Sequence, residues 1–575
     1  MFMTKRQSAP RNHATTLSER TAFFRERLRK WFAASAVIGV ITGLSVAAIH
    51  YIVYEVLWQQ LLNHVTSLWL WFLLPLIGIV ISGFLVYRFS RSPSLYGTEE
   101  FVQSFHENEG RMDERSALTK IIAAIATIGL GGSAGLEGPG IQVGATVASW
   151  LHKQIAQFGF DEEDRRWMVL AGAAAGVAAV FKAPLTGIIF ALEAPYRDDL
   201  AHNATIPALI ASTTSYFVFV SIIGTRPLFN VPRFVAPDYR TLLYALLLGV
   251  VTGLAARGFV MLFHWIGDFY DNLIPNPYMR AVAGGAVVGL TGVASILLFS
   301  EPLSLGIGYE GIRHILAGNM GLMALIALFT LKAIATSTTL RSGGVGGTFL
   351  PLVFLGAVVG SSFGYIIRST NIVYPIMGMA GFLAAGYNAP LAAAAFVAET
   401  TGSPGFIIPG LIAAAVSYVF SGRLGLSTQQ RYGRQTVIHH MLHRTVAESM
   451  TTDVIVLDSS STISEFVNNY VVRFRHHSFP VVDDSTLLGM VDLSDTKEVP
   501  ETDWSNTSVK DIMNHEAITV FQDETLAHAL DKMDQYGVKR LPVIDRKNPG
   551  KIIGLISMTD IVRIEQLSAF VQDND

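Results

Sequence analysis

The sequence predicts a polytopic α-helical membrane protein with an inverted repeat and broken helices, followed by a cytosolic pair of α/β domains. Three observations support this fold class. Hydrophobic residues make up 51% of the 575 positions and charged residues only 15%, which is too apolar for a soluble protein of this length. A pattern of glycine and proline recurs at fixed spacing in the two halves of the apolar region. Beyond about residue 431, short apolar strands alternate with amphipathic helices.

Residues 1–31 form a basic segment that we expect in the cytosol. They include Arg25, Arg27 and Lys30 close to the first apolar run, and they show no cleavable signal. Positively charged flanks of membrane helices stay inside. The soluble tail has no translocation signal of its own, so both termini are predicted to be cytosolic, with an even number of crossings. We expect a multi-pass protein of the plasma (inner) membrane.

Residues 32–430 form the predicted transmembrane domain, with halves at about 32–225 and 240–430. Several of its apolar segments are too short to span ~30 Å of hydrocarbon as single helices. Short segments interrupted by glycine indicate broken helices, which membranes tolerate where the loose backbone lines a cavity or is buried in protein. The apolar segments lie near residues 33–57, 68–89, 117–130, 141–153, 167–195, 205–224, 241–266, 279–299, 320–340, 350–367, 374–398 and 405–421.

Residues 131–193 are repeated in residues 343–399. A glycine pair, a proline and a Gly-Ala pair recur without a gap, and an Ala-Pro-Leu sequence followed by Phe and Glu recurs further on. Paired broken-helix units are typical of transporters whose site lies at the repeat interface. If the copies are inverted, the bends at Glu137 and Phe349 meet near the midplane, and helix N-termini converge on one anion. Close helix packing explains the small residues but not their fixed spacing.

Glu137 is the candidate gate. Residues 131–139 read GGSAGLEGP, which places one carboxylate in a glycine-rich bend at membrane depth. An ionisable group in hydrocarbon costs at least ~2.5 kcal/mol, so we expect it to face an aqueous path or a partner. Pro139 favours the first turn of a helix, whose free amides form an anion site. An ionised Glu137 competes with the anion for such a site, and a protonated or displaced one yields it. A locally bonded glutamate is the alternative.

Three motifs resemble those of the CLC family of chloride channels and proton-coupled chloride transporters. They are GLEGP at 135–139, GTFLP at 347–351, and KAPL at 182–185 together with ETTG at 399–402. The resemblance covers about residues 33–430. It implies a homodimer with one pore per subunit, chloride as the default anion, no required cofactor, and the glutamate of the first motif as gate. The anion contacts that it implies in these motifs are Gly135, Leu136, Gly138, Thr348 and Phe349.

Four positions depart from the family pattern. Leu136 replaces an Arg or Lys, which lowers the positive potential at the outer mouth. Tyr96 lies where a serine meets the anion, and Ser427 lies where a tyrosine is usual. This exchange preserves two anion-binding hydroxyls in a reshaped pocket, or it indicates another anion such as bicarbonate, nitrate or fluoride. Ala194 replaces the internal proton relay, which leaves Glu193 as relay candidate, with backbone bonding as its alternative. Proton-coupled antiport and a passive gated channel both stay open.

Residues 431–446 form a polar linker that contains three histidines. His439, His440 and His443 have no adjacent acid or cysteine, so solvated side chains are expected and no metal site is predicted.

Residues 447–498 and 507–567 form a second repeat that resembles paired CBS domains. In that family a Gly-x-x-Ser/Thr-x-x-Asp motif holds adenosine nucleotides, with the hydroxyl on phosphate and the aspartate on ribose. The second copy matches with Ser557 and Asp560, whereas the first has Asp492 in place of the hydroxyl. We expect at most one nucleotide site, and a ligand-free dimerisation module is the alternative.

Anion transport tuned by the CBS pair is the leading functional hypothesis. A CBS-regulated divalent-cation transporter is a rival, but it requires carboxylates at several depths of the pore. A membrane enzyme is a second rival, but the chain has no His-Glu-x-x-His helix and no phosphate-binding Walker loop, so no enzymatic activity is expected. The expected partners are an anion, protons where transport is coupled, membrane lipid and a second copy of the chain, without nucleic acid.

Overall fold

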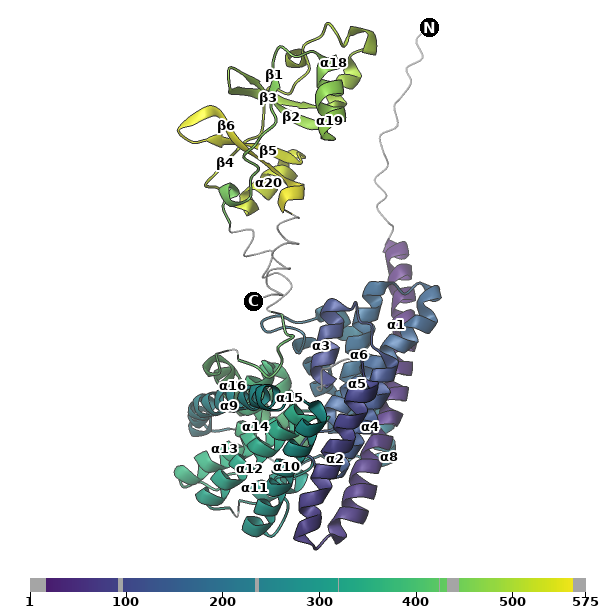
Figure 1. Cartoon of the computed structure of the whole chain (residues 1–575), viewed down its shortest axis with the longest axis vertical. Helices are drawn as coiled ribbons and strands as arrows, with labels where there is room; N and C mark the ends of the chain where they lie inside the picture. The colour runs from purple at the N-terminus through teal and green to yellow at the C-terminus, as the bar shows by residue number, and fades with distance from the viewer. Residues whose placement is uncertain are drawn as a thin grey trace. The chain divides into compact units, whose positions relative to one another are not determined.

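The computed structural model describes residues 17–91, 97–232, 237–318, 320–422, 424–431 and 444–561. The chain divides into two compact units, Met1–Tyr432 and Gly433–Asp575, which are described separately (Figure 1).

The first unit is a bundle of helices, seven of which, in the part of the chain that the structure describes, are long and apolar enough to cross a membrane. This confirms the predicted polytopic helical fold. The first helix continues as a π-helical stretch over Tyr51–Leu61. The helices are α1 (Leu17–His50), α2 (Leu68–Phe89), α3 (Gly97–Glu107), α4 (Glu114–Gly129), α5 (Glu137–Ile155), α6 (Glu162–Phe181), α7 (Pro184–Glu193), α8 (Thr205–Ile223), α9 (Tyr239–Leu273), α10 (Pro277–Phe299), α11 (Tyr309–Leu316), α12 (Leu322–Ser342), α13 (Phe349–Ile366), α14 (Val373–Tyr387), α15 (Pro390–Thr401) and α16 (Ile407–Phe420).

Two of the apolar segments are each broken into two helices. The segment near 167–195 separates into α6 and α7, and the segment near 374–398 separates into α14 and α15. At each break one residue adopts a left-handed backbone, Lys182 with φ of 54° and Asn388 with φ of 55°. A proline two residues later begins the next helix, because proline lacks the N–H that would continue the previous one. Hydropathy alone does not register such a break.

The two glycine-rich bends meet. Gly135 and Gly347 exchange backbone hydrogen bonds of 2.8 Å in both directions, as an antiparallel bridge. Helices α5 and α13 begin two residues after these glycines, so their N-termini lie side by side. This confirms the predicted meeting of the bends in an inverted arrangement.

Glycines also set the distance between the helices that follow each bend. Gly144 of α5 faces Gly172 of α6, and their repeat equivalents Gly356 of α13 and Gly378 of α14 face each other. A Cβ on any of these four glycines would overlap the backbone of its partner. The recurring glycines therefore allow the backbones of α5 and α6, and of α13 and α14, to touch.

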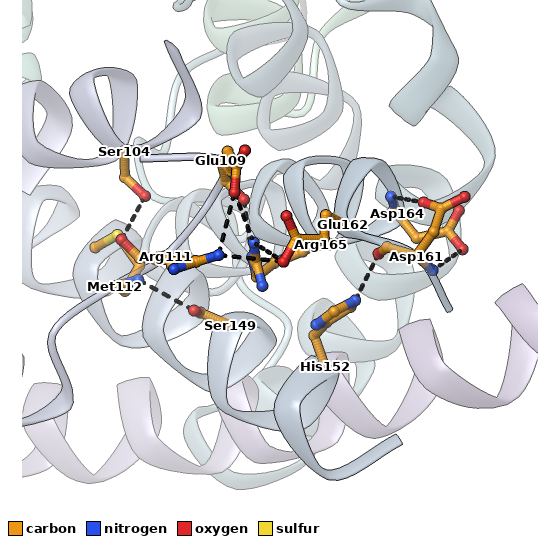
Figure 2. Close-up of polar contacts among 10 residues, drawn as sticks. All are labelled: Ser104, Glu109, Arg111, Met112, Ser149, His152, Asp161, Glu162, Asp164 and Arg165. Atoms are coloured by element: carbon orange, nitrogen blue, oxygen red, sulfur yellow. Dashed lines mark hydrogen bonds and ion pairs between the residues drawn. The ribbon is translucent and has the colours of Figure 1, made fainter. Parts of the chain in front are cut away.

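An ion-pair network holds the loops between α3 and α4 and between α5 and α6 (Figure 2). Arg111 donates to Glu109 at 3.2 Å and to Glu162 at 3.1 Å, and Arg165 Nε donates to the Glu109 carbonyl at 2.8 Å. Exposed pairs contribute only about 0–1 kcal/mol each, but together these contacts fix the chain that follows α3.

The second unit contains a six-stranded sheet in the order β1-β2-β3-β6-β5-β4. Each copy of the CBS repeat contributes an antiparallel hairpin, β2–β3 or β5–β6, and one parallel strand beside it. The strands are β1 (Leu457–Asp458), β2 (Ser478–Asp483), β3 (Thr486–Asp492), β4 (Val520–Phe521), β5 (Arg540–Asp545) and β6 (Asn548–Ser557), and the helices are α18 (Ile463–Glu465), α19 (Val472–Phe474) and α20 (Leu526–Tyr536).

The two copies of the tail exchange their leading segments. Val446 packs in the core of the second copy, and its N–H donates to Glu524 O at 2.8 Å. Val509 packs in the core of the first copy, and its N–H donates to Ser461 O at 2.9 Å. Val446, which the sequence analysis left in the linker, is therefore fully buried. Each small core is completed by the other copy, so neither copy is a separate folding unit.

The glycine contact between α5 and α6 gives a stability prediction. Gly172→Leu forces these helices apart and lowers the stability of the protein by at least about 1–3 kcal/mol, the typical cost of overpacking. Thermal unfolding of the detergent-solubilised protein, followed by size-exclusion chromatography, measures this loss. Gly258→Leu is the control, because a Cβ at Gly258 in α9 meets nothing within 4 Å. Equal losses in the two variants would contradict the packing argument.

Candidate functional site

The Glu137 carboxylate lies on the N-terminus of α13. Its Oε1 accepts hydrogen bonds from Phe349 N at 2.6 Å and from Leu350 N at 3.4 Å. The side chain is fully buried, and Oε2 has no hydrogen-bond partner among the residues that the structure describes. Free amides and the helix dipole make a helix N-terminus an anion site. The carboxylate therefore occupies a position suited to an anion.

Glycines make room for this carboxylate. A Cβ on Gly135 or on Gly347 would overlap the Glu137 carboxyl group. A Cβ on Gly138 would lie 2.9 Å from the backbone of Gly346. Leu136 is the N-cap residue of α5 and is 2% exposed. The space for the Glu137 carboxyl group is therefore bounded by backbone at the predicted residues Gly135 and Gly138. The predicted residue Leu136 is buried between them.

Phe349 is anchored by aromatic rings from both halves of the repeat. Its ring centroid lies 4.6 Å from that of Phe181, 5.4 Å from that of Phe190 and 5.0 Å from that of Phe396. Aromatic pairs at such distances favour offset or edge-to-face packing. This cluster fixes the first turn of α13 and so fixes the amides that hold Glu137.

A small hydroxyl-lined cavity lies beside the bend that precedes α13. Its volume is about 10 Å³, close to the minimum for one water molecule. The hydroxyls of Thr348 and Tyr387 are 2.6 Å apart. The Ser427 Oγ is buried and lacks a hydrogen-bond partner in the described part of the chain. The lining residues are Thr98, Glu99, Phe263, Gly347, Thr348, Tyr387, Leu426 and Ser427.

The structure therefore brings the predicted residues Thr348 and Ser427 to one cavity, next to Phe349. Tyr96 lies outside the described residues. Sequence reasoning missed Tyr387, whose phenol hydroxyl faces this cavity. The signal was present in the repeat, because Tyr387 and Phe181 each precede an Ala-Pro-Leu motif by two residues, and only Tyr387 carries a hydroxyl.

Lys332 of α12 is a buried cation that the sequence reasoning also missed. It is fully buried, and its Nζ donates to Ser304 O at 3.3 Å and to Gly306 O at 3.1 Å. It lies close enough to Glu137 to interact with it electrostatically. Since Leu136 carries no charge, Lys332 is a basic side chain from another helix that acts on this carboxylate. A lysine inside the apolar segment near 320–340 was the available signal.

A larger cavity of about 480 Å³ lies beside the start of α11. Gly308 and Tyr309 line it, together with Trp58 and Glu310. The Tyr309 hydroxyl is buried, has no hydrogen-bond partner among the described residues, and interacts electrostatically with Glu137. Residues that contact or influence Glu137 thus border both cavities.

Glu193 and Glu399 cap each other's repeat. Glu193 accepts hydrogen bonds from Leu391 N at 3.1 Å and Ala392 N at 2.8 Å, in the first turn of α15. Glu399 accepts from Leu185 N at 2.9 Å and from Thr186 N at 2.7 Å, in the first turn of α7. Both oxygens of Glu193 are therefore bonded to backbone, which is the alternative considered beside its relay role.

Gln430 closes the region around Ala194. Its Nε2 donates to Ala194 O at 3.0 Å and to Tyr387 O at 2.9 Å, and its Oε1 accepts from Asn388 Nδ2 at 3.0 Å. Gln430 is 5% exposed. Ala194 thus carries a methyl group where the family resemblance implies a carboxylate, and its carbonyl bonds to a neutral amide.

In the tail, the candidate nucleotide residues bond to each other. Ser557 Oγ donates to Asp560 Oδ2 at 2.6 Å. In the first copy the equivalent pair is acidic, and Asp492 N donates to Asp495 Oδ2 at 2.8 Å. Partial burial raises the pKa of the Asp495 carboxyl, and the neighbouring Asp492 carboxylate adds to this rise. The first copy thus presents two acids where the second presents a hydroxyl and one acid.

Comparison with known proteins identifies the family. Residues 78–422 match the family model of voltage gated chloride channels, and residues 445–499 and 509–566 match the CBS domain model. The chain belongs to the voltage-gated chloride channel (CLC) family. Among its relatives, the H(+)/Cl(−) exchange transporter ClcA of Vibrio cholerae is 30% identical over 438 residues, which cover 72% of this chain and 89% of ClcA.

Solved structures show the same fold. The crystal structure of a CLC-type fluoride/proton antiporter aligns with a TM-score of 0.60 at 23% identity, covering 72% of this chain and 99% of that one. The crystal structure of a eukaryotic CLC transporter aligns with a TM-score of 0.59 at 19% identity, covering 93% and 98%. These likenesses and the family assignment confirm the predicted CLC fold with a CBS pair, and anion transport rather than enzymatic activity. They leave the divalent-cation alternative without support.

The reciprocal caps of this CLC protein give a second prediction. Glu193→Ala and Glu399→Ala each leave buried helix amides unpaired, which typically costs about 1–3 kcal/mol per group. Both variants should unfold at lower temperature than the wild-type protein, by similar amounts. If Glu193 served only to relay protons, Glu193→Ala would keep wild-type stability and change proton transport alone.

Proposed function

We propose that this CLC protein exchanges chloride for protons across the membrane, with Glu137 as both gate and proton carrier. One observation carries the proposal: the Glu137 carboxylate takes the amides of Phe349 and Leu350, where a permeating anion would bind. The relative named as an H(+)/Cl(−) exchange transporter supports chloride and protons as the two substrates.

The exchange follows from competition for one set of amides. Ionised Glu137 satisfies the N-terminus of α13 and excludes an anion from it. A proton on the carboxylate removes its charge, so the amide of Phe349 gains more from an anion than from the neutral acid. The anion then binds, and the protonated side chain moves away. Main-chain dipoles hold the anion without a direct ion pair, so it can also leave.

We assign the anion path to the bends and to the hydroxyls of the small cavity. Gly135, Leu136 and Gly138 shape the position beside Glu137, and Phe349 contributes its amide. The hydroxyls of Thr348, Ser427 and Tyr387 supply neutral donors at the cavity. Tyr96 is proposed as a further contact on the family resemblance alone.

A passive chloride channel gated by Glu137 is the second candidate function. The channel function is favoured by Ala194, because alanine has no carboxylate at the position expected for the proton relay. The Ala194 carbonyl is bonded to Gln430 Nε2. In such a channel Glu137 opens on protonation but carries no proton across.

We further propose that the protein is a homodimer in the lipid of the plasma (inner) membrane, with both termini in the cytosol. The family resemblance supports the dimer, and the basic residues before the first apolar segment support the orientation. Exposed apolar side chains on α8 and α16, including Phe217, Ile408 and Val419, supply surfaces for lipid or for a second copy.

In the tail we propose one regulatory nucleotide site, at Ser557 and Asp560. A serine hydroxyl can donate to a phosphate, whereas Asp492 and Asp495 repel phosphate at the equivalent place in the first copy. The nucleotide would replace the Ser557–Asp560 hydrogen bond with contacts of its own.

Glu137→Gln tests the gate. Without an ionisable group at the amides of α13, uphill proton movement should fall by about a hundredfold or more, the usual scale for a lost proton-transfer group. Chloride efflux should continue and become less dependent on pH, because the gate no longer titrates. Both ions are measured on the full-length protein in liposomes. Glu114→Gln, which removes an exposed carboxylate in the first turn of α4, is the control. A pH-dependent efflux unchanged in Glu137→Gln would refute the gate.

The nucleotide site has its own test. Isothermal titration with ATP should give one site per chain. Asp560→Ala should weaken the affinity by about tenfold or more, because charge-assisted hydrogen bonds contribute roughly 1.5–3 kcal/mol. Asp495→Ala in the first copy should bind ATP as the wild-type protein does. Two sites per chain, or equal losses in both variants, would contradict a single site at Asp560.

A further inference from the structure

The small cavity beside Glu137 has one carboxylate among its described lining residues, that of Glu99. We propose that Glu99 is the inner proton-exchange residue, which passes protons between solvent and Glu137 across this cavity. The inference rests on the proton-coupled exchange proposed above, and it names the residue that performs the task left open by Ala194.

Glu99 stands between solvent and the cavity. It lies in the first turn of α3, next to Thr98, and both side chains line the cavity. Glu99 is partly exposed, whereas Thr98 is 4% exposed. Its Oε1 accepts hydrogen bonds from Thr428 N at 3.0 Å and from Thr428 Oγ1 at 3.4 Å. These bonds hold the carboxylate at the cavity and leave it within reach of water.

The cavity borders both Glu99 and the bend that holds Glu137. Gly347 lines the cavity, and a Cβ on this same residue would overlap the Glu137 carboxyl group. Thr348 also lines the cavity, and the amide of the next residue, Phe349, donates to Glu137. The backbone of one short bend therefore separates the two acids.

Hydroxyls that line the cavity can carry a proton. Thr348 and Tyr387 share a hydrogen bond of 2.6 Å. Ser427 Oγ, at 4% residue exposure, is a buried hydroxyl that lines the cavity and lacks a partner among the residues described. Each hydroxyl or water accepts one proton and gives up another, so a proton bound by Glu99 from solvent leads to one proton on Glu137. Only O–H bonds are broken and formed.

The other residues considered for the inner proton-exchange role already have hydrogen-bond or ion-pair partners. Both oxygens of Glu193 accept hydrogen bonds from the first-turn amides of α15, and Gln430 fills the surroundings of Ala194. Glu100, next to Glu99, forms a buried ion pair with Lys120.

The charged groups that act on Glu99 come from two other helices. They are His264 of α9 and Arg341 of α12. His264 Nε2 lies 3.5 Å from Gly425 O, and Arg341 lies 4.0 Å from Asp271 Oδ2. Figure 1 shows α3 toward the end of the membrane unit at which α1 begins, which is the cytosolic end if the N-terminus is cytosolic.

The position of Glu99 also couples anion and proton binding. An anion in the cavity and an ionised Glu99 repel each other, because like charges at short range disfavour joint ionisation. Protonation of Glu99 therefore accompanies entry of the anion. A residue that merely supported α3 would show no such coupling.

Glu99→Gln in the full-length protein tests the proposal. In liposomes, proton uptake driven by a chloride gradient should fall by about a hundredfold, while chloride efflux continues. Glu99→Asp should restore coupled transport. The matched control is Glu107→Gln, because Glu107 is an exposed glutamate two turns further along α3 and should leave both fluxes at wild-type values.

The outcomes separate this proposal from the function on which it rests. If wild-type protein couples and Glu99→Gln couples equally well, the role of Glu99 is overturned and the exchange function stands. If wild-type protein moves chloride without driving protons, the exchange function fails and the role of Glu99 fails with it.

If Glu99→Gln transports neither chloride nor protons, a chloride-binding measurement tests the proposal. Chloride affinity is measured by isothermal titration in the Glu137→Gln background, which removes the titration of the gate. At about pH 5 chloride should bind roughly tenfold more tightly than at about pH 8, through protonation of Glu99. The double variant Glu137→Gln/Glu99→Gln should bind equally at both values. Persistence of the pH dependence in the double variant would overturn the proposal.

Discussion

The membrane unit is organised around one contact, the carboxylate of Glu137 on the amides that begin α13. A helix N-terminus offers an anion unpaired N–H groups and a favourable dipole. In a buried site the N–H groups of a helix N-terminus bind a carboxylate strongly. Because this binding involves no direct ion pair, the carboxylate can also leave. In the proposed exchange, the Glu137 carboxylate is an internal anion that occupies the position of the transported one.

The two halves of the protein complete each other wherever the site requires support. Gly135 and Gly347 join the bends, and Glu193 and Glu399 satisfy the helix starts of the opposite repeat. The tail uses the same principle, since Val446 completes the core of the other copy. Each copy supplies contacts that the other copy lacks, such as the acceptors for unpaired amides at a helix start. These contacts hold the two copies in one relative position.

Much of the site could be predicted because its signals are local. A glutamate between glycines and a proline, repeated bends at fixed spacing, and Ala-Pro-Leu breaks are all visible within short stretches of sequence. Lys332, Tyr387 and Glu99 were not singled out, although Lys332 and Tyr387 left signals in an apolar segment and in the repeat. Their roles come from neighbours on distant segments: Lys332 meets Gly306, Tyr387 meets Thr348, and Glu99 meets Thr428.

Local chemistry thus established where helices break, which acid enters the membrane and that two copies of one unit exist, because glycine, proline and an isolated carboxylate have strong intrinsic preferences in lipid. It could not establish what stands opposite that acid. The partner of Glu137 is an amide more than two hundred residues away, and the hydroxyls of the nearby cavity come from four separate segments. Those distances depend on how α-helices pack across the inverted repeat, which only the folded chain specifies.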